Sequence, residues 1–245
     1  MKLAVVIPTY NEKETLPSLI EELLHEIKKI AEKFSIIIVD DASPDGTGQI
    51  AEELNKEYGN ISVVHRKTKL GLGSAYKEGF RFALDSLQPD FIVQMDADHS
   101  HNPKEISQML QSMHDYDFAV ASRHVSGGTV VGWGTYRKLL HSTAGTLAAI
   151  CGGLKISDPT SGFRVFKKNV LNAVDFSKIK SDGFAFQIEI LCLLKRMGFR
   201  GFEFPTVFIN RKDGKSKMGI NESIQFVKTC MRLLMNRALS SLRLR

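Results

Sequence analysis

Three short apolar segments, residues 2–7, 35–39 and 91–95, are each followed directly by a polar or acidic loop. Each segment has the length and composition of a buried strand. The loops are Pro8–Glu12, Asp40–Thr47 and Asp96–Asp98. In an open α/β sheet, ligands bind beyond the carboxyl ends of the strands, so loops that are far apart in sequence share one site. The pattern therefore predicts an α/β sheet with a polar ligand site along one edge.

Asp96 and Asp98 place two carboxylates at the mouth of the third strand. Carboxylate oxygens suit the hard cations Mg²⁺ and Mn²⁺, which bind through one or two carboxylates and complete their shells with water and substrate phosphates. A D-x-D pair alone is a weak signal, because such pairs also form turns and helix caps. In combination with the other two loops, it indicates a divalent cation bound for diphosphate chemistry.

Helical and strand patterns alternate along the chain, as a doubly wound sheet requires. Apolar residues recur at helical spacing from Leu16 to Ala31, with Thr15 as the predicted cap and Pro17 in the first turn. Further predicted helices are 48–58, 74–87 and 103–114, and further predicted strands are 61–65 and 117–122. The glycine-rich run 126–134 and the basic run 210–219 are predicted to be mobile loops.

The composition agrees with one α/β domain, since the chain has 245 residues of which 43% are hydrophobic. Three cysteines, Cys151, Cys192 and Cys230, are odd in number and widely spaced, which argues against a disulfide framework. We find no signal-peptide pattern and no run of about 18 apolar residues, so we expect a cytosolic protein that does not span a membrane by itself. The net charge of +6 favours an anionic partner, and nucleic acid or an acidic membrane would both fit that number.

The motifs PTYNE (8–12), VDD-x-SPDGT (39–47) and DAD (96–98) resemble those of the inverting, GT-A type glycosyltransferases of family 2. Later motifs narrow the resemblance to the dolichyl-phosphate (polyprenyl-phosphate) mannosyltransferases, and to members that lack transmembrane helices. These motifs are Ser126–Gly128 with Gly132, Trp133 and Arg137, then Ser157–Arg164, Phe186–Glu189, and Arg211 with Gly214–Lys217. The resemblance implies one GT-A domain over residues 1–222, with a Rossmann-like, mostly parallel central sheet and helices on both faces. An amphipathic helical segment over residues 223–245 would follow it.

The activity implied by the resemblance is the transfer of mannose from GDP-mannose to the phosphate of a dolichyl or polyprenyl lipid, with inversion at the anomeric carbon. A phosphate monoester carries more than one negative charge near neutral pH, because its second pKa is about 6. A strong general base is then dispensable. Cations must instead hold two anionic groups on opposite sides of one carbon, with Mg²⁺ or Mn²⁺ on the leaving diphosphate and arginines on the acceptor.

For the donor, the resemblance assigns the guanosine contacts to residues of the first two loops and of the strand 35–39 that precedes the second loop. They are Pro8, Tyr10, Glu12, Val39 and Asp41. Asp96 and Ala97 would contact ribose and diphosphate, with Asp98 as the principal metal ligand and Asp96 beside it. Arg211 and Lys217 would close over the diphosphate from a basic, glycine-containing loop. From the residues alone, Tyr10 could equally fill the core, and Asn11 and Asp45 could merely build turns.

For the acceptor, Arg123 and Arg137 lie fourteen residues apart around the glycine-rich run, as the phosphate-binding arginines do in the relatives. The planar guanidinium suits bidentate contact with phosphate, although any single arginine can be a surface charge. The resemblance makes both arginines catalytic and gives Arg123 a donor contact as well. His141 falls where relatives tend to have a serine near the acceptor phosphate, with Ser142 next to it.

Several polar residues near these motifs have open roles. Ser100 stands where some relatives have a glutamine that also reaches the metal. His99 and His101 would suit Zn²⁺ or Fe²⁺, but the family does not use them so, and we interpret them as solvent-facing loop histidines. Asp158 is expected to orient Arg137 or to cap the following turn.

Two further motifs have mainly structural interpretations. Gln187 and Glu189 interrupt an otherwise apolar helix, and their burial would be costly unless they face the site, so they are second-tier candidates. Gly71–Tyr76 superficially resembles a dinucleotide loop, but it lacks the third glycine and lies too late in the chain. We interpret this segment as the start of a helix.

The C-terminal segment carries one apolar helical stripe with basic residues mostly off it. The stripe consists of Ile224, Val227, Met231, Leu234, Met235, Ala238 and Leu242, and the basic residues are Lys228, Arg232, Arg237 and Arg243. This pattern fits an interfacial helix on an anionic membrane, or a docking surface for a small membrane-anchoring subunit. The alternative is a terminal helix packed on its own domain. We therefore expect peripheral association with the cytoplasmic face of a membrane, and no nucleic-acid partner.

Two alternative functions stay open. One is a polyprenyl-phosphate glucosyltransferase that uses UDP-glucose, because no residue here clearly distinguishes guanine from uracil. A catalytically silent basic module that binds membranes or nucleic acid is the alternative from another class. The presence of two carboxylates and four basic residues at the positions of the family's motifs argues against such a module, because binding alone needs no metal site. These residues are Asp96, Asp98, Arg123, Arg137, Arg211 and Lys217.

Overall fold

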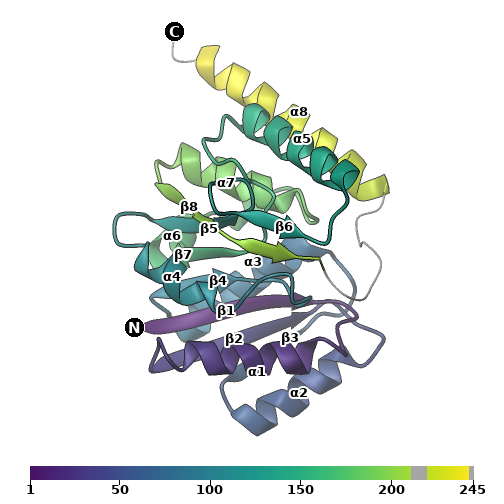
Figure 1. Cartoon of the computed structure of the whole chain (residues 1–245), viewed down its shortest axis with the longest axis vertical. Coiled ribbons are helices and arrows are strands. Elements are labelled where there is room, and N and C mark those ends of the chain that lie inside the picture. Colours follow the sequence, from purple (N-terminus) through teal and green to yellow (C-terminus); the bar gives the residue numbers. More distant parts are fainter. Residues whose placement is uncertain (211–219, 243–245) are drawn as a thin grey trace.

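The structure is a computed structural model that describes residues 1–210 and 220–242. A seven-stranded sheet runs through its centre in the order β3-β2-β1-β4-β7-β5-β8 (Figure 1). Its strands are β1 (Lys2–Thr9), β2 (Lys33–Asp40), β3 (Ile61–His65), β4 (Phe91–Gln94), β5 (Phe118–Ser122), β7 (Arg164–Lys167) and β8 (Gly201–Pro205). Only β7 runs antiparallel to its neighbours, β4 and β5. The predicted mostly parallel sheet is confirmed.

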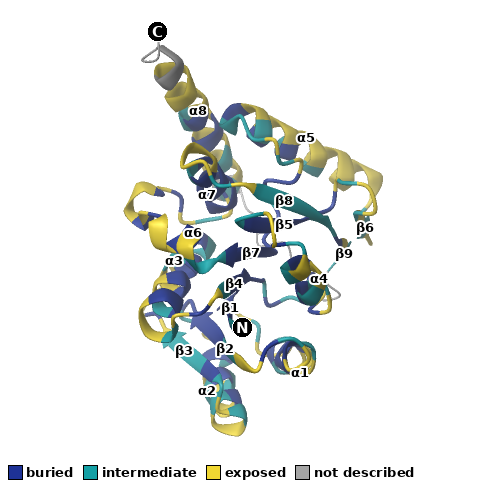
Figure 2. Ribbon diagram, turned by 90° about the vertical axis from the view of Figure 1, so that its left-hand side faces the viewer, coloured by how far each residue is buried: buried dark blue, intermediate teal, exposed yellow. Residues whose placement is uncertain are grey.

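Helices cover both faces of this sheet, because alternate strand residues point to opposite sides. Leu3, Val5 and Ile7 face one core, which α1 (Leu16–Ile27), α2 (Thr47–Tyr58) and α4 (Glu105–Gln111) complete. Ala4 and Val6 face the other core. That core is completed by α3 (Leu72–Phe82), which continues as a π-helical turn (Ala83–Leu87), and by α6 (Lys168–Ala173) and α7 (Phe186–Arg196). Figure 2 shows the middle strands of the sheet as buried, whereas the edge strands β3 and β8 are mostly of intermediate burial.

The first helix follows the predicted apolar spacing, with Leu19, Ile20 and Leu23 fully buried. Burial of one such side chain contributes roughly 1.5–3 kcal/mol. Thr15 is the N-cap residue, as predicted, but its side chain accepts no bond from the helix. Its hydroxyl instead donates to the carbonyl and carboxylate oxygens of Glu12, at 3.2 and 3.0 Å. Thr15 therefore fixes the loop before the helix rather than the helix end.

Two long helices, α5 (Thr135–Gly152) and α8 (Ile220–Leu242), pack against one another at one end of the molecule (Figure 1). They share a small core with α7 that contains all three cysteines, Cys151, Cys192 and Cys230. The cysteines are free and buried, and burial raises the pKa of Cys192 to about 12 and that of Cys230 to about 11.

A second, two-stranded sheet pairs β6 (Thr129–Val131) with β9 (Val207–Ile209). β6 lies inside the glycine-rich run, so that run is partly ordered by strand pairing and is not simply a loop. Within the described part of the chain, no helix is long and apolar enough to cross a membrane.

Candidate active site

The carboxyl ends of β1, β2 and β4 lie side by side, so the three polar loops converge as predicted. Thr9 ends β1 opposite Asp40 in the register. The Thr9 carbonyl accepts a hydrogen bond from the Asp41 amide at 2.9 Å, and the Thr9 hydroxyl donates to Asp40 Oδ1 at 3.2 Å. These bonds join the first two loops into one wall.

Asp41 is buried and accepts three hydrogen bonds from the segment after β3. Arg66 Nη1 donates to Oδ1 at 2.7 Å, the Leu70 amide to Oδ1 at 2.9 Å, and the Gly71 amide to Oδ2 at 2.8 Å. Asp41 thus organises the wall of the site, and its contact with guanosine stays a prediction. Sequence reasoning missed Arg66, although a basic residue directly after a strand was an available signal.

The first loop presents Tyr10 and Glu12 at the surface of the site. Tyr10 is half-buried, with Lys69 Nζ 3.6 Å from its ring centroid, so it does not fill the core. The Glu12 amide donates to Thr47 Oγ1 at 2.9 Å. Pro8 and Val39 are buried in their strands, and Val39 packs close to Gly79. Any ligand contact of Val39 would therefore use its backbone.

The D-x-D loop holds its two carboxylates in different surroundings. Asp96 Oδ1 accepts a hydrogen bond from the Tyr76 hydroxyl at 2.6 Å, and its side chain is 27% exposed. Asp98 Oδ1 accepts bonds from the Ser100 amide at 3.1 Å and from the Ser100 hydroxyl at 2.5 Å. Ser100 therefore orients Asp98, and Ala97 between the carboxylates is buried.

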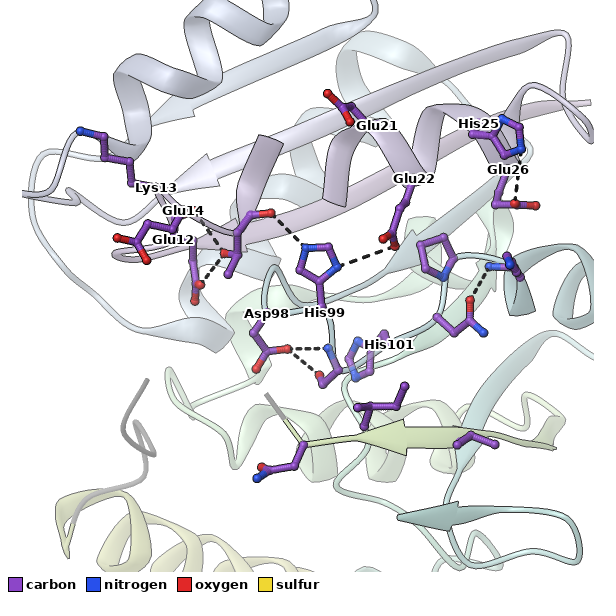
Figure 3. Close-up of a pocket in the computed structure, with 18 of the residues that line it drawn as sticks. Glu12, Lys13, Glu14, Glu21, Glu22, His25, Glu26, Asp98, His99 and His101 are labelled. Atoms are coloured by element: carbon purple, nitrogen blue, oxygen red, sulfur yellow. Dashed lines mark hydrogen bonds and ion pairs between the residues drawn. The ribbon is translucent and has the colours of Figure 1, made fainter. Parts of the chain in front are cut away.

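The interpretation of the two histidines of this loop as solvent-facing is wrong for His101, whereas the His99 side chain is 32% exposed. His101 is 5% exposed and stacks on Phe163 with ring centroids 5.1 Å apart, and its Nδ1 accepts a bond from the Asp96 amide at 3.2 Å. Burial lowers the pKa of His101. His99 adopts a φ of 57° and lies against α1, with Nε2 2.9 Å from the Ser18 hydroxyl. Its Nδ1 lies 3.7 Å from Glu22 Oε2 (Figure 3).

A pocket of about 1260 Å³ opens beside Asp98, between α1, the loop before α4, and β9. Glu12 and Asp98 both line it, together with the acidic side chains Glu14, Glu21 and Glu22 (Figure 3). Tyr10, Asp41 and the arginines do not line this pocket. Its acidic walls suit a cation rather than an anionic acceptor.

The described residues contain no preassembled group of three or more His, Cys, Asp or Glu side chains that could hold a metal. Two carboxylates at a sheet edge fit a Mg²⁺ or Mn²⁺ ion that completes its shell with diphosphate oxygens and water. They do not fit a closed protein-only site such as that of a structural zinc.

The acceptor-side cations begin with Arg123, which follows β5 directly. Its Nε donates to Asp158 Oδ2 at 2.6 Å, and its Nη2 donates to Asp158 Oδ1 at 2.7 Å and to Thr160 at 3.0 Å. Burial alone would raise the pKa of Asp158, but the hydrogen bonds and charge of Arg123 hold it well below its usual range. The expected pairing of Asp158 with Arg137 is wrong, because Arg123 takes both carboxylate oxygens.

Arg137 is exposed on the first turn of α5. Its guanidinium lies 4.4 Å from the Trp133 ring centroid, and its Nη1 donates to Asn210 Oδ1 at 3.4 Å. His141, one turn later, has Nε2 3.1 Å from the Thr160 hydroxyl and its ring 5.1 Å from Trp133. Arg123, Arg137 and His141 therefore meet around Trp133 and Thr160.

Burial and the nearby charge of Arg123 lower the pKa of His141 to about 4, so the imidazole is neutral near physiological pH. Ser142 is exposed and lines a different pocket with His124 and Arg237, away from this cluster. Arg211 and Lys217 lie outside the described residues, and their closure over the diphosphate stays a prediction.

The second-tier candidates have structural partners. The Gln187 side-chain carbonyl accepts a bond from Gln94 at 2.7 Å in the core. Glu189 accepts bonds from the Lys180 and Ser181 amides and pairs with Arg232 of α8 at 2.9 Å. These partners compensate the burial of Glu189, whereas Gln187 Nε2 is buried without a hydrogen-bond partner among the described residues.

Comparison with known sequences gives the family. Glycosyl transferase family 2 matches residues 4–175. The chain is 38% identical over 218 residues to the undecaprenyl-phosphate mannosyltransferase of Micrococcus luteus, covering 89% of this chain and 88% of the relative. It is 40% identical over 216 residues to the polyprenol monophosphomannose synthase of Mycolicibacterium smegmatis, covering 87% and 80%.

Solved structures share the fold at low sequence identity. A mannosyltransferase from Pyrobaculum calidifontis, in complex with GDP-Man and Mn²⁺, matches with a TM-score of 0.61 at 15% identity, over 97% of this chain and 64% of that one. Glucosyl-3-phosphoglycerate synthase from Mycobacterium tuberculosis, in complex with Mn²⁺, UDP and phosphoglyceric acid, matches with a TM-score of 0.67 at 18% identity, over 95% and 78%. The expected GT-A fold is confirmed. The chain thus belongs to glycosyl transferase family 2, and the predicted resemblance to its polyprenyl-phosphate mannosyltransferases is borne out.

Proposed function

We propose that this protein transfers mannose from GDP-mannose to the phosphate of a dolichyl or polyprenyl lipid, with inversion at the anomeric carbon. The observation that carries the proposal is the position of an acidic loop and a cationic cluster on two sides of Phe208, whose ring lies 6.1 Å from that of His101 and 5.2 Å from the Arg123 guanidinium. Asp96 and Asp98 follow β4 in the acidic loop, whereas Arg123, Arg137 and the neutral His141 gather around Trp133. The names of the two bacterial relatives support the mannosyl group and the polyprenyl acceptor.

In this proposal, Asp98 and Asp96 hold Mg²⁺ or Mn²⁺ together with the donor diphosphate. The bound cation would neutralise the negative charge that develops on the leaving diphosphate. Pro8, Tyr10, Glu12, Val39 and Asp41 would bind the guanosine part, and Arg211 and Lys217 would close over the phosphates. The mannosyl group in the names of the two bacterial relatives favours GDP-mannose over UDP-glucose as the donor.

The acceptor half would orient the lipid phosphate by charge and geometry. Asp158 and Thr160 fix the guanidinium of Arg123, so this cation is already oriented before a ligand binds. Arg137 is exposed and would add the second cation. His141 would act as a neutral hydrogen-bonding group, since its lowered pKa keeps it uncharged. The phosphate itself then attacks, without a general base.

We further propose that α5 and α8 form the membrane-facing surface. Their large exposed apolar side chains are Tyr136, Leu139, Leu140, Leu147, Ile150, Ile224, Val227, Met231, Leu234, Met235 and Leu239. The two helices carry five Lys or Arg residues and one acidic residue, which favours an anionic bilayer. Figure 2 shows that α5 is exposed along its outer side. Arg137 and His141 belong to the same helix, so a lipid phosphate bound there would keep its chain beside Leu139 and Leu140.

One assay tests the proposed function. The full chain is incubated with Mn²⁺, a polyprenyl phosphate and either GDP-mannose or UDP-glucose, and lipid-linked product is measured by mass spectrometry. Mannosyl lipid from GDP-mannose alone is the expected result. Preferential glucosyl transfer would replace the donor assignment, and no transfer from either donor would favour the silent binding module.

A further inference from the structure

Both carboxylates that we assign to the donor nucleotide are hydrogen-bonded to one short segment, Leu70–Tyr76. Asp41 follows β2 and accepts bonds from the Leu70 and Gly71 amides at 2.9 and 2.8 Å. Asp96 follows β4 and accepts a bond from the Tyr76 hydroxyl at 2.6 Å. The start of α3 thus connects two donor-site carboxylates that lie on different strands.

This segment is held rigidly from its other side by the turn before α7. The Gly73 amide donates to the Asp182 carbonyl at 2.7 Å. Gly71 has a φ of 97°, and a Cβ there would lie 2.6 Å from the same carbonyl oxygen. A Cβ on Gly73 would lie 2.4 Å from Phe186 Cβ. The two glycines therefore permit close packing of α3 on the α7 region, which explains their presence in the sequence without a dinucleotide ligand.

Tyr76 is fully buried, so its ring has one position. It stacks on Phe80 and Phe186, with centroids 5.8 and 6.1 Å apart. Its hydroxyl donates to Asp96 Oδ1 at 2.6 Å. The second oxygen of Asp96, Oδ2, lies against Gly162, where an added Cβ would be 2.9 Å away. Tyr76 and Gly162 therefore confine the Asp96 carboxylate from both sides.

We propose that Tyr76 is a positioning residue for the donor site, which fixes the orientation of Asp96 through its hydroxyl. The segment 70–76 also binds Asp41, so that the relative position of the two carboxylates is fixed before the donor binds. Tyr76 touches neither the donor nor the reacting carbon. The inference rests on the proposed function, because it takes Asp96 as a donor and metal contact.

The test replaces Tyr76 by phenylalanine, which keeps the stacked ring and removes only the hydroxyl. Loss of an outer hydrogen-bonding partner of a metal ligand typically lowers metal affinity or activity by about 10–100-fold. We expect Tyr76→Phe to raise the KM values for Mn²⁺ and GDP-mannose by about ten-fold, with the acceptor KM unchanged. Tyr116→Phe is the matched control. Tyr116 also packs on a phenylalanine, Phe202, but it lies just before the N-terminal end of β5.

A double-mutant cycle separates positioning from general stability. GDP binding in the presence of Mn²⁺ is measured by calorimetry for Tyr76→Phe, Asp96→Ala and the double variant, with the folded fraction checked by urea unfolding. If Tyr76 acts through Asp96, its substitution has no further effect in the Asp96→Ala background, which lacks the accepting oxygen. Independent, additive losses would overturn the inference, as would wild-type KM values in Tyr76→Phe. Failure of the unaltered chain to bind GDP would remove the proposed function, and this inference with it.

Discussion

Arg123 and Asp158 form a buried, bidentate ion pair whose two contacts measure 2.6 and 2.7 Å. Their side chains are 7% and 0% exposed, so water screens the pair little. The guanidinium is therefore fixed in one orientation beside Trp133 and Thr160. Arg137, in contrast, is exposed and rests on the Trp133 ring. The cationic half of the site thus combines one rigid and one adjustable arginine.

Asp158→Asn should strongly destabilise the fold, because it leaves the Arg123 cation buried without a charged partner. Removing one partner of a buried ion pair typically costs about 3–5 kcal/mol. Urea unfolding measures the change in the free energy of unfolding. Asp115→Asn, at an exposed aspartate, is the control and should shift that free energy by less than about 0.5 kcal/mol. Equal shifts in the two variants would mean that the pair is not a stabilising element.

Asp98→Ala should abolish metal-dependent transfer while leaving the fold intact, because this carboxylate lies in a loop at the site rather than in the core. Chelation of divalent cations should have the same effect on the unaltered chain. Turnover is measured at saturating Mn²⁺, alongside thermal unfolding. Wild-type turnover in Asp98→Ala would rule out its role as a metal ligand.

Arg137→Ala should raise the KM for polyprenyl phosphate by about ten-fold or more, since a hydrogen bond to a charged group contributes about 1.5–3 kcal/mol. GDP binding should be unchanged, because Arg137 is assigned to the acceptor. Lys138→Ala removes a neighbouring charge of the same helix and serves as the control. A loss of GDP binding in Arg137→Ala would move this arginine to the donor side.

The stability of the fold should depend on pH through His141. Its pKa of about 4 in the folded state lies below the ordinary value of 6.5, so the unfolded chain takes up the proton first as the pH falls. The corresponding stability is complete above pH 6.5 and is lost as the pH falls towards 4. His141→Asn should therefore flatten the decline in the urea midpoint across this window. The same slope in His141→Asn and in the unaltered chain would contradict the assignment.

Met231→Glu should weaken binding to vesicles that contain anionic lipid, because it places a charge on the exposed surface of α8. Met197→Glu introduces the same charge at an exposed methionine after α7 and is the matched control. Co-sedimentation with vesicles measures binding, and transfer to a short, water-soluble acceptor should be unaffected in both. Equal vesicle binding by the two variants would argue against this membrane surface.

Truncation of the C-terminal segment would not test the membrane surface alone, because α8 has two roles in the structure. Thr229, Cys230 and Leu233 are buried, and Arg232 pairs with Glu189 of α7. The predicted exposed stripe is present at Ile224, Val227, Met231, Leu234 and Met235. Removal of the helix would therefore expose a core as well as delete a membrane surface. The division into residues 1–222 and 223–245 stays a prediction.

Periodicity and strand endings predicted the sheet and most helices, because they depend on local burial patterns that the sequence records directly. The three converging loops followed from the position of parallel strand ends. The partners of individual side chains could not be predicted in this way. Asp158 pairs with Arg123 and not with Arg137, and His101 is buried against Phe163, because the β5–β7 pairing and β9 bring distant segments together. Such contacts depend on three-dimensional packing that no local spacing encodes.

The most direct test of the proposed function is the anomeric configuration of the product. Mannosyl polyprenyl phosphate is isolated after incubation of the full chain with GDP-mannose, Mn²⁺ and polyprenyl phosphate, and its anomeric carbon is assigned by NMR. Direct attack by the lipid phosphate, held by Arg123 and Arg137, predicts a configuration opposite to that of the donor. Retention of the donor's configuration, or the absence of mannosyl lipid in a preparation that is folded and binds GDP, would contradict the account.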